Sequence, residues 1–313
     1  MVVLAAPSLA QEPRGADVLP ATEALLESDQ VPVLLQEPEM VELQKLIQTQ
    51  RWPQANLLAG KLVSGSPQEP KGHFWLGYVQ LRQHDWLAAI RSLRRSQKLG
   101  LRDAELMLTL GLAYYAIHQF VLFKEQMQKA IEADPRKPWP HYYLGLYEIG
   151  TTENYEEGAR HFREALLREP NDFRTLSYHG FCQEALGARE SARRDYATAI
   201  GWVERRNAKF SLPYQRMALL LAETDPGLAL QFARKAAQAE DGVASNQLVL
   251  AKLYEDHGKT QDAIQALKAA AQADPTLASP HYRLHRLFAK LGDRNAASEA
   301  LAEFQILSKL YGP

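Results

Sequence analysis

The sequence contains almost no cysteine. Cys182 is the single cysteine among 313 residues, which excludes both an intramolecular disulfide and a zinc site built from several thiolates. A lone cysteine usually behaves as a small apolar core residue, so we expect Cys182 to be buried. A reactive thiol is the alternative interpretation.

The sequence has neither a large net charge nor a long apolar run. Lys and Arg total 36 against 37 Asp and Glu, which gives a net charge of −1. Nucleic-acid-binding proteins usually carry a basic patch or stripe, and lipid-binding segments carry clusters of Lys and Arg, so this balance argues against both partners. No apolar run reaches the roughly 18 residues that a membrane-spanning helix needs.

The common catalytic motifs are also missing. The sequence has no Gly-rich phosphate loop, no Gly-x-Ser-x-Gly turn and no His-Glu-x-x-His helix. His281 and His285 are spaced to share one helical face, but a zinc site needs at least one further ligand. We therefore predict no enzyme activity, no catalytic residue, no metal, no cofactor and no small-molecule substrate. A metal-dependent accessory or enzyme using His281 and His285 is kept as an alternative.

A positive signal comes from the stretch 244–275, ASNQLVLAKLYEDHGKTQDAIQALKAAAQADP. It predicts two short amphipathic helices that meet at a turn around Gly258 and stop at Pro275. Small residues, Ala251 on the first helix and Ala263 on the second, allow the two helices to cross closely. The order and spacing of Leu250-Ala251, Tyr254, Gly258, Ala263, Ala270 and Pro275 resemble the tetratricopeptide repeat, whose period is 34 residues.

The pattern recurs along residues 36–311. Leu-Gly pairs end at Gly77, Gly111 and Gly145 with a spacing of 34, and Gly180 follows 35 residues later. In the second helices Ala229, Ala263 and Ala297 repeat at 34. Because one helix pair cannot bury its apolar face alone, the copies must stack. The resemblance implies an all-α, right-handed superhelical solenoid of about eight helix-turn-helix repeats.

Two departures from the pattern are visible. Phe123 stands where an alanine is expected, so the third repeat should splay or repack. Ala192 and Ala229 are 37 residues apart instead of 34, and the excess lies in 201–211, GWVERRNAKFS. We expect either one extra helical turn or a bulging loop there.

Residues 1–35 lie outside the repeats. Met1–Ala10 is apolar and ends in small residues, like the last part of a secretory signal, but it lacks a positively charged start. The segment up to residue 35 is rich in Pro and acidic residues, as in a disordered linker, with one short helix expected at 22–28. The alternatives are a signal remnant, and hence a periplasmic or secreted protein, or an ordinary terminus of a cytoplasmic one. The repeat endings also resemble those of bacterial envelope or secreted tetratricopeptide proteins.

The resemblance further implies a binding surface. In this family the first helices of the repeats line a concave groove, in which partners usually lie. The inward positions that match this pattern are mainly aromatic in the second to fifth repeats: Phe74, Tyr78, Leu81, Leu108, Leu112, Tyr115, Trp139, Tyr142, Leu146 and Phe181.

We therefore expect a non-catalytic scaffold or adaptor that binds a segment of another protein along these helices. The alternative is an architectural subunit that uses its convex face and edges and fills its own groove.

Overall fold

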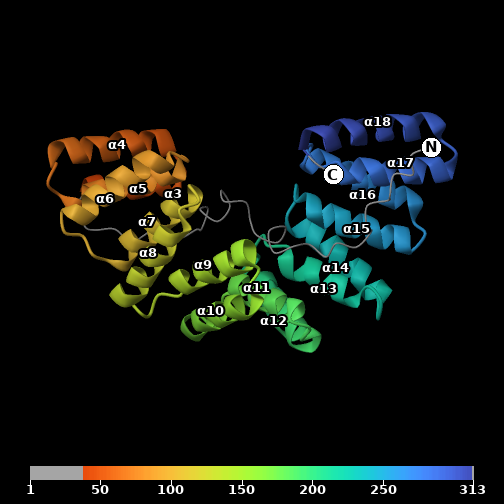
Figure 1. Cartoon of the computed structure of the whole chain (residues 1–313), viewed down its shortest axis with the longest axis horizontal. Coiled ribbons are helices and arrows are strands. Elements are labelled where there is room, and N and C mark those ends of the chain that lie inside the picture. Colours follow the sequence, from red (N-terminus) through yellow and green to blue (C-terminus); the bar gives the residue numbers. More distant parts are fainter. Residues whose placement is uncertain (1–37, 312–313) are drawn as a thin grey trace. The chain divides into compact units, whose positions relative to one another are not determined.

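The computed structural model describes residues 38–311 and divides at Pro170 into two compact units. Within 38–311 it contains sixteen α-helices, one π-helical turn and no strand. The expectations for 1–35, namely the signal remnant, the linker and the helix at 22–28, lie outside the described residues. Consecutive helices pack against each other as antiparallel pairs within each unit (Figure 1). The predicted all-helical arrangement of eight helix-turn-helix repeats is confirmed for this part of the chain.

The first unit holds four helix pairs. They are α3 (Pro38–Gln48) with α4 (Trp52–Gly65), α5 (Pro70–Arg82) with α6 (Trp86–Lys98), α7 (Ala104–Ala116) with α8 (Phe120–Ala133), and α9 (Trp139–Tyr147) with α10 (Tyr155–Arg168). The π-helical turn η1 (Glu148–Thr152) follows α9 directly.

The second unit holds the other four pairs. They are α11 (Phe173–Ala185) with α12 (Arg189–Arg206), α13 (Leu212–Leu221) with α14 (Pro226–Ala239), α15 (Ala244–Asp256) with α16 (Thr260–Ala273), and α17 (Ser279–Leu291) with α18 (Arg294–Tyr311).

Local sequence signals define where many of these helices begin and turn. Side chains cap several N-termini; for example, Asp103 Oδ1 accepts from the Leu106 amide at 2.8 Å, and Asp172 Oδ2 accepts from the Thr175 amide at 2.8 Å. In seven of the eight repeats the turn between the two helices has one residue in the left-handed region: Gln50, His84, His118, Glu153, Gly187, Gly258 and Gly292. The predicted turn at Gly258 is confirmed, with φ +70°.

In several helix pairs the crossing point holds a glycine that faces a large side chain. A Cβ added at Gly77 would lie 2.6 Å from Leu93 Cγ, and one added at Gly145 would lie 2.7 Å from the Phe162 ring. A Cβ added at Gly180 would lie 2.8 Å from the Tyr196 ring. The large partners follow their glycines by 16 or 17 residues and are fully buried. The small residue is therefore required because the large side chain already fills the crossing point.

Phe123 repacks its repeat without opening it. Its side chain is fully buried, and its ring lies 5.3 Å from the Tyr115 ring and 5.6 Å from the Tyr147 ring, measured between centroids. The carbonyl oxygen of Phe123 still comes within 3.5 Å of a Cβ built at Gly111. The helices α7 and α8 therefore remain close, and of the two expected outcomes the repacking is confirmed.

Both spacing irregularities have a structural explanation. The 35-residue step from Gly145 to Gly180 coincides with η1, since a π-helical turn accommodates one extra residue in a helix. The 37-residue step from Ala192 to Ala229 coincides with α12, which has 18 residues, whereas α6, α8 and α10 have 13 or 14. Of the two expected alternatives, the extra helical turn is confirmed.

The crossing constraint gives a testable prediction. We expect Gly77→Ala to lower the free energy of unfolding by about 1–3 kcal/mol, because the new methyl group overlaps Leu93 and lies 3.1 Å from the Ala89 carbonyl oxygen. Thermal melting followed by circular dichroism measures the change. The matched control is Gly60→Ala in α4, where nothing lies within 4 Å of an added Cβ; it should be neutral or stabilising by up to about 1 kcal/mol. Equal melting temperatures for the two variants would contradict the crossing constraint.

Candidate functional site

The ten predicted groove residues do not share one environment. Nine lie on α5, α7 and α9 of the first unit, and Phe181 lies on α11 of the second. Seven of the ten are buried: Phe74, Tyr78, Leu81, Leu112, Tyr142, Leu146 and Phe181. The other three, Leu108, Tyr115 and Trp139, are partly exposed.

On α5 the predicted residues form a tight aromatic cluster. The Phe74 ring meets the Trp75 ring edge-on at a centroid distance of 4.9 Å, and Trp75 meets Tyr78 at 5.6 Å. Phe74 and Tyr78 retain only 4% and 6% of their accessible surface. Burial raises the pKa of the Tyr78 hydroxyl. These side chains contribute mainly to packing.

Two of the partly exposed residues, Tyr115 on α7 and Trp139 on α9, pack against neighbouring aromatic rings. The Tyr115 ring packs 5.6 Å from Phe120 and 5.3 Å from Phe123. The Trp139 ring packs edge-on against Tyr142 at 5.5 Å, and Tyr142 in turn meets Phe162 of α10 at 6.1 Å. Leu108 lies one turn before Leu112 on the same face of α7. Leu108, Tyr115 and Trp139 are called the exposed triad below.

In the second unit Phe181 lies beneath a buried ion pair. The Arg216 guanidinium is centred 5.2 Å from the Phe181 ring. Its Nη2 donates to Glu184 Oε1 at 2.5 Å and its Nε donates to Glu184 Oε2 at 3.0 Å. The Tyr196 hydroxyl donates to the same Oε2 at 2.8 Å. This network joins α11, α12 and α13 and was not foreseen from the sequence, because its members are 12 and 32 residues apart.

A pair of buried histidines lies in the repeat that carries Trp139. The Nδ1 atoms of His141 on α9 and His161 on α10 are 3.4 Å apart, and each residue is 8% exposed. Burial, followed by the neighbouring Arg160 charge, lowers the pKa of His161 to about 4. Burial and Arg168 also lower the pKa of His141. Both imidazoles are therefore neutral near pH 7.

No cluster of metal-binding side chains is found among residues 38–311. No group of three or more His, Cys, Asp or Glu side chains in this part of the chain is placed to hold a metal ion. His285 Nδ1 lies 2.9 Å from the Ala297 carbonyl oxygen, so it bridges α17 to α18 at their crossing. Cys182 is fully buried as predicted, and burial raises the pKa of its thiol to about 12.

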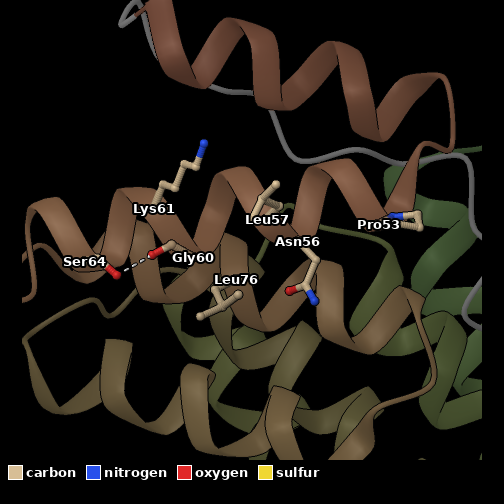
Figure 2. A pocket seen from close by; sticks show the side chains of 7 residues that line it. All are labelled: Pro53, Asn56, Leu57, Gly60, Lys61, Ser64 and Leu76. Atoms are coloured by element: carbon tan, nitrogen blue, oxygen red, sulfur yellow. Dashed lines mark hydrogen bonds between the residues drawn. The ribbon is translucent and has the colours of Figure 1, made fainter.

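A shallow depression lies at the first repeat, away from the predicted residues. Its volume is about 660 Å³. Figure 2 shows that α4 supplies most of its lining and that Leu76 of α5 completes it. The α4 residues are Pro53, Asn56, Leu57, Gly60, Lys61 and Ser64. Among the described residues that line it, Lys61 is the one with a charged side chain.

Solved structures show what this helical arrangement is similar to. The structure of the Cut9–Hcn1 hetero-tetramer of APC/C has a TM-score of 0.68 and 13% identity, over 82% of this chain and 50% of that one. Yeast Tom70 has a TM-score of 0.64 and 14% identity, over 94% of this chain and 66% of that one. PilF of Pseudomonas aeruginosa has a TM-score of 0.57 and 21% identity, over 66% of this chain and 91% of that one.

This is a tetratricopeptide-repeat fold. The resemblance in the repeat sequence is thereby confirmed at the level of the fold. No family model matches the sequence, and the comparison with curated proteins gave no match. The chain spans about half the length of the Cut9–Hcn1 chain that it matches.

The tetratricopeptide helices themselves are short. None of the helices between residues 38 and 311 combines the length and apolar character needed to cross a membrane.

The exposed triad is the part of the predicted groove that presents large side chains to solvent. It is therefore the candidate site in this fold.

The histidine pair gives a prediction for pH. Because the folded-state pKa of His161 is about 4 against an ordinary 6.5, the unfolded chain binds more protons between these values. Stability is then fully present above pH 6.5 and is lost as the pH falls toward 4, by on the order of 2 kcal/mol. Urea titrations across this range measure it. His161→Gln should flatten the dependence; an unchanged slope in that variant would assign the acid sensitivity to other groups.

Proposed function

We propose that this protein is a non-catalytic scaffold that binds a segment of a partner protein along the first helices of its repeats. The observation that carries the proposal is the exposed triad. Leu108, Tyr115 and Trp139 are large apolar or aromatic side chains that remain partly exposed on consecutive first helices of the first unit. Such side chains commonly dominate binding energy because they bury a large area at a small entropic cost.

The rigid support of these residues favours the same role. Tyr115 is held by Phe120 and Phe123, and Trp139 by Tyr142. A contact residue that is already ordered loses little conformational freedom when a partner binds. The Cut9 structure, which shares the fold, is a complex with Hcn1. This supports a protein partner here without identifying one.

The test is the capture of a partner from the native host followed by titration with variants. We expect the double variant Leu108→Ala/Trp139→Ala to weaken binding by about 2 kcal/mol or more, which is about 30-fold, while the melting temperature changes little. The matched control is Val121→Ala on α8, an 82% exposed apolar residue outside the predicted surface. It should bind like the wild type. Equal loss in the control, or none in the double variant, would refute this use of the surface.

Tyr142→Ala separates binding from packing in the same experiment. Tyr142 is 6% exposed and contacts Trp139, Tyr143 and Phe162. Its truncation should lower the free energy of unfolding by about 3–5 kcal/mol, as expected for a buried aromatic residue. A melting temperature close to that of the wild type would show that the residue is not required for packing.

The second candidate function is an architectural subunit that binds through its convex face and edges. The burial of seven of the ten predicted residues favours it, because those side chains are already used to hold the repeats together. It predicts that the captured partner tolerates the Leu108→Ala/Trp139→Ala variant fully. The two functions are thus distinguished by the same titration.

We also propose that the protein is exported to the periplasm or secreted, on the basis of the apolar Met1–Ala10 segment that ends in small residues. The mature chain would then begin at Gln11. N-terminal sequencing of the protein from its own host tests this. Recovery of an intact Met1 from the cytosolic fraction would contradict it.

A further inference from the structure

The additional turn of α12 builds a cationic surface that the groove does not include. Arg205 and Arg206 lie in this turn, beyond the 13 or 14 residues of the second helices of the first unit, and Trp202 lies directly before it. The Arg205 guanidinium carbon lies 4.9 Å from the centroid of the Trp202 ring, and that of Arg206 lies 5.4 Å from it. Stacking on an aromatic face orders a guanidinium group while it remains charged.

The Phe173 ring brings a third arginine, Arg174, close to Arg206. Arg206 also lies 5.8 Å from the Phe173 ring, and Arg174 of α11 lies 5.0 Å from that ring. Phe210, in the segment that returns from α12, packs on Phe173 at 5.4 Å. The three guanidinium groups therefore converge on adjoining rings from two helices. We call Arg174, Arg205 and Arg206 with their supporting rings the arginine cluster.

Two carboxylates of this part of the second unit, Glu204 and Glu240, are engaged by other groups. Glu204 pairs with Lys235 at 2.9 Å. Glu240 Oε2 accepts hydrogen bonds from both the amide and the hydroxyl of Ser211. Arg205 and Arg206 are exposed and form no ion pair with any residue in the range that the structure describes. Cations in the last turn of a helix favour its C-terminus, but this does not account for Arg174, which belongs to the first turn of another helix.

We propose that the arginine cluster is a second docking surface, and that it binds an acidic segment of a partner protein through its carboxylates. Guanidinium groups form planar, bidentate contacts with carboxylates. A nucleic-acid strand fits less well, because the guanidinium groups already stack on the Trp202 and Phe173 rings that bases would need. The chain also has a net charge of −1, without the extended basic stripe that phosphate backbones require.

The test measures binding of a fluorescein-labelled oligoglutamate peptide to the full chain by fluorescence anisotropy. We expect binding that weakens as ionic strength rises. Arg205→Ala/Arg206→Ala should weaken it by at least about ten-fold. The matched control is Arg193→Ala/Arg194→Ala, which removes the same charge from the same helix. There Arg193 pairs with Glu190 and Arg194 donates to Ser191, so neither depends on an aromatic ring. This control should bind nearly as well as the wild type.

A third variant tests the stacking itself. Trp202→Leu keeps every charge but removes the ring that orders Arg205 and Arg206, so we expect it to lower the affinity for oligoglutamate several-fold. A melting curve of this variant, recorded in parallel, shows whether it remains folded. Absence of oligoglutamate binding would overturn the proposal. So would equal losses in the two double-arginine variants, which would indicate a general electrostatic effect. Tighter binding of an oligothymidylate that depends on Arg205 and Arg206 would assign the surface to nucleic acid instead.

Discussion

The close crossing of two helices within each repeat is the constraint on which the rest of this structure depends. Gly77, Gly145 and Gly180 are required because Leu93, Phe162 and Tyr196 fill the space opposite them. Interaxial distance depends on the side chains at the contact, and a core packed at this density cannot absorb an extra methyl group without shifts. The arrangement repeats because a single pair leaves an apolar face that only the next pair can cover.

The departures from the repeat are where the individual properties of this protein arise. One extra residue in the fourth repeat coincides with the π-helical turn η1, next to the helix that carries Trp139 and His141. Three extra residues in the fifth repeat coincide with the longer α12 and place Arg205 and Arg206 beyond the normal helix end, next to Trp202. A solenoid tolerates such insertions at the ends of its helices, because the crossing points that set the packing are not displaced.

Two surfaces with different chemistry follow from the fold. The exposed triad in the first unit presents apolar and aromatic area that is supported by buried rings. The arginine cluster in the second unit presents charge that is ordered by rings. In both cases an aromatic side chain reduces the freedom of the contact residue before a partner arrives, which lowers the entropic cost of binding.

Sequence alone determined the helical repeats, their number and the turn at Gly258, and it predicted the burial of Cys182, because each depends on local spacing and on residue size at fixed positions. It also located the insertion at 201–211, but only the structure decided that the insertion extends α12. Only the tertiary structure decided which groove residues are accessible. Phe74 and Leu108 occupy matching places in the 34-residue pattern, yet Phe74 is buried against Trp75 whereas Leu108 is partly exposed. Exposure depends on the neighbouring helix and on the rotation of each side chain, neither of which is encoded in the period. The Glu184–Arg216–Tyr196 network and the arginine cluster were also invisible in the sequence, since their members come from separate helices that only packing brings within a few ångströms.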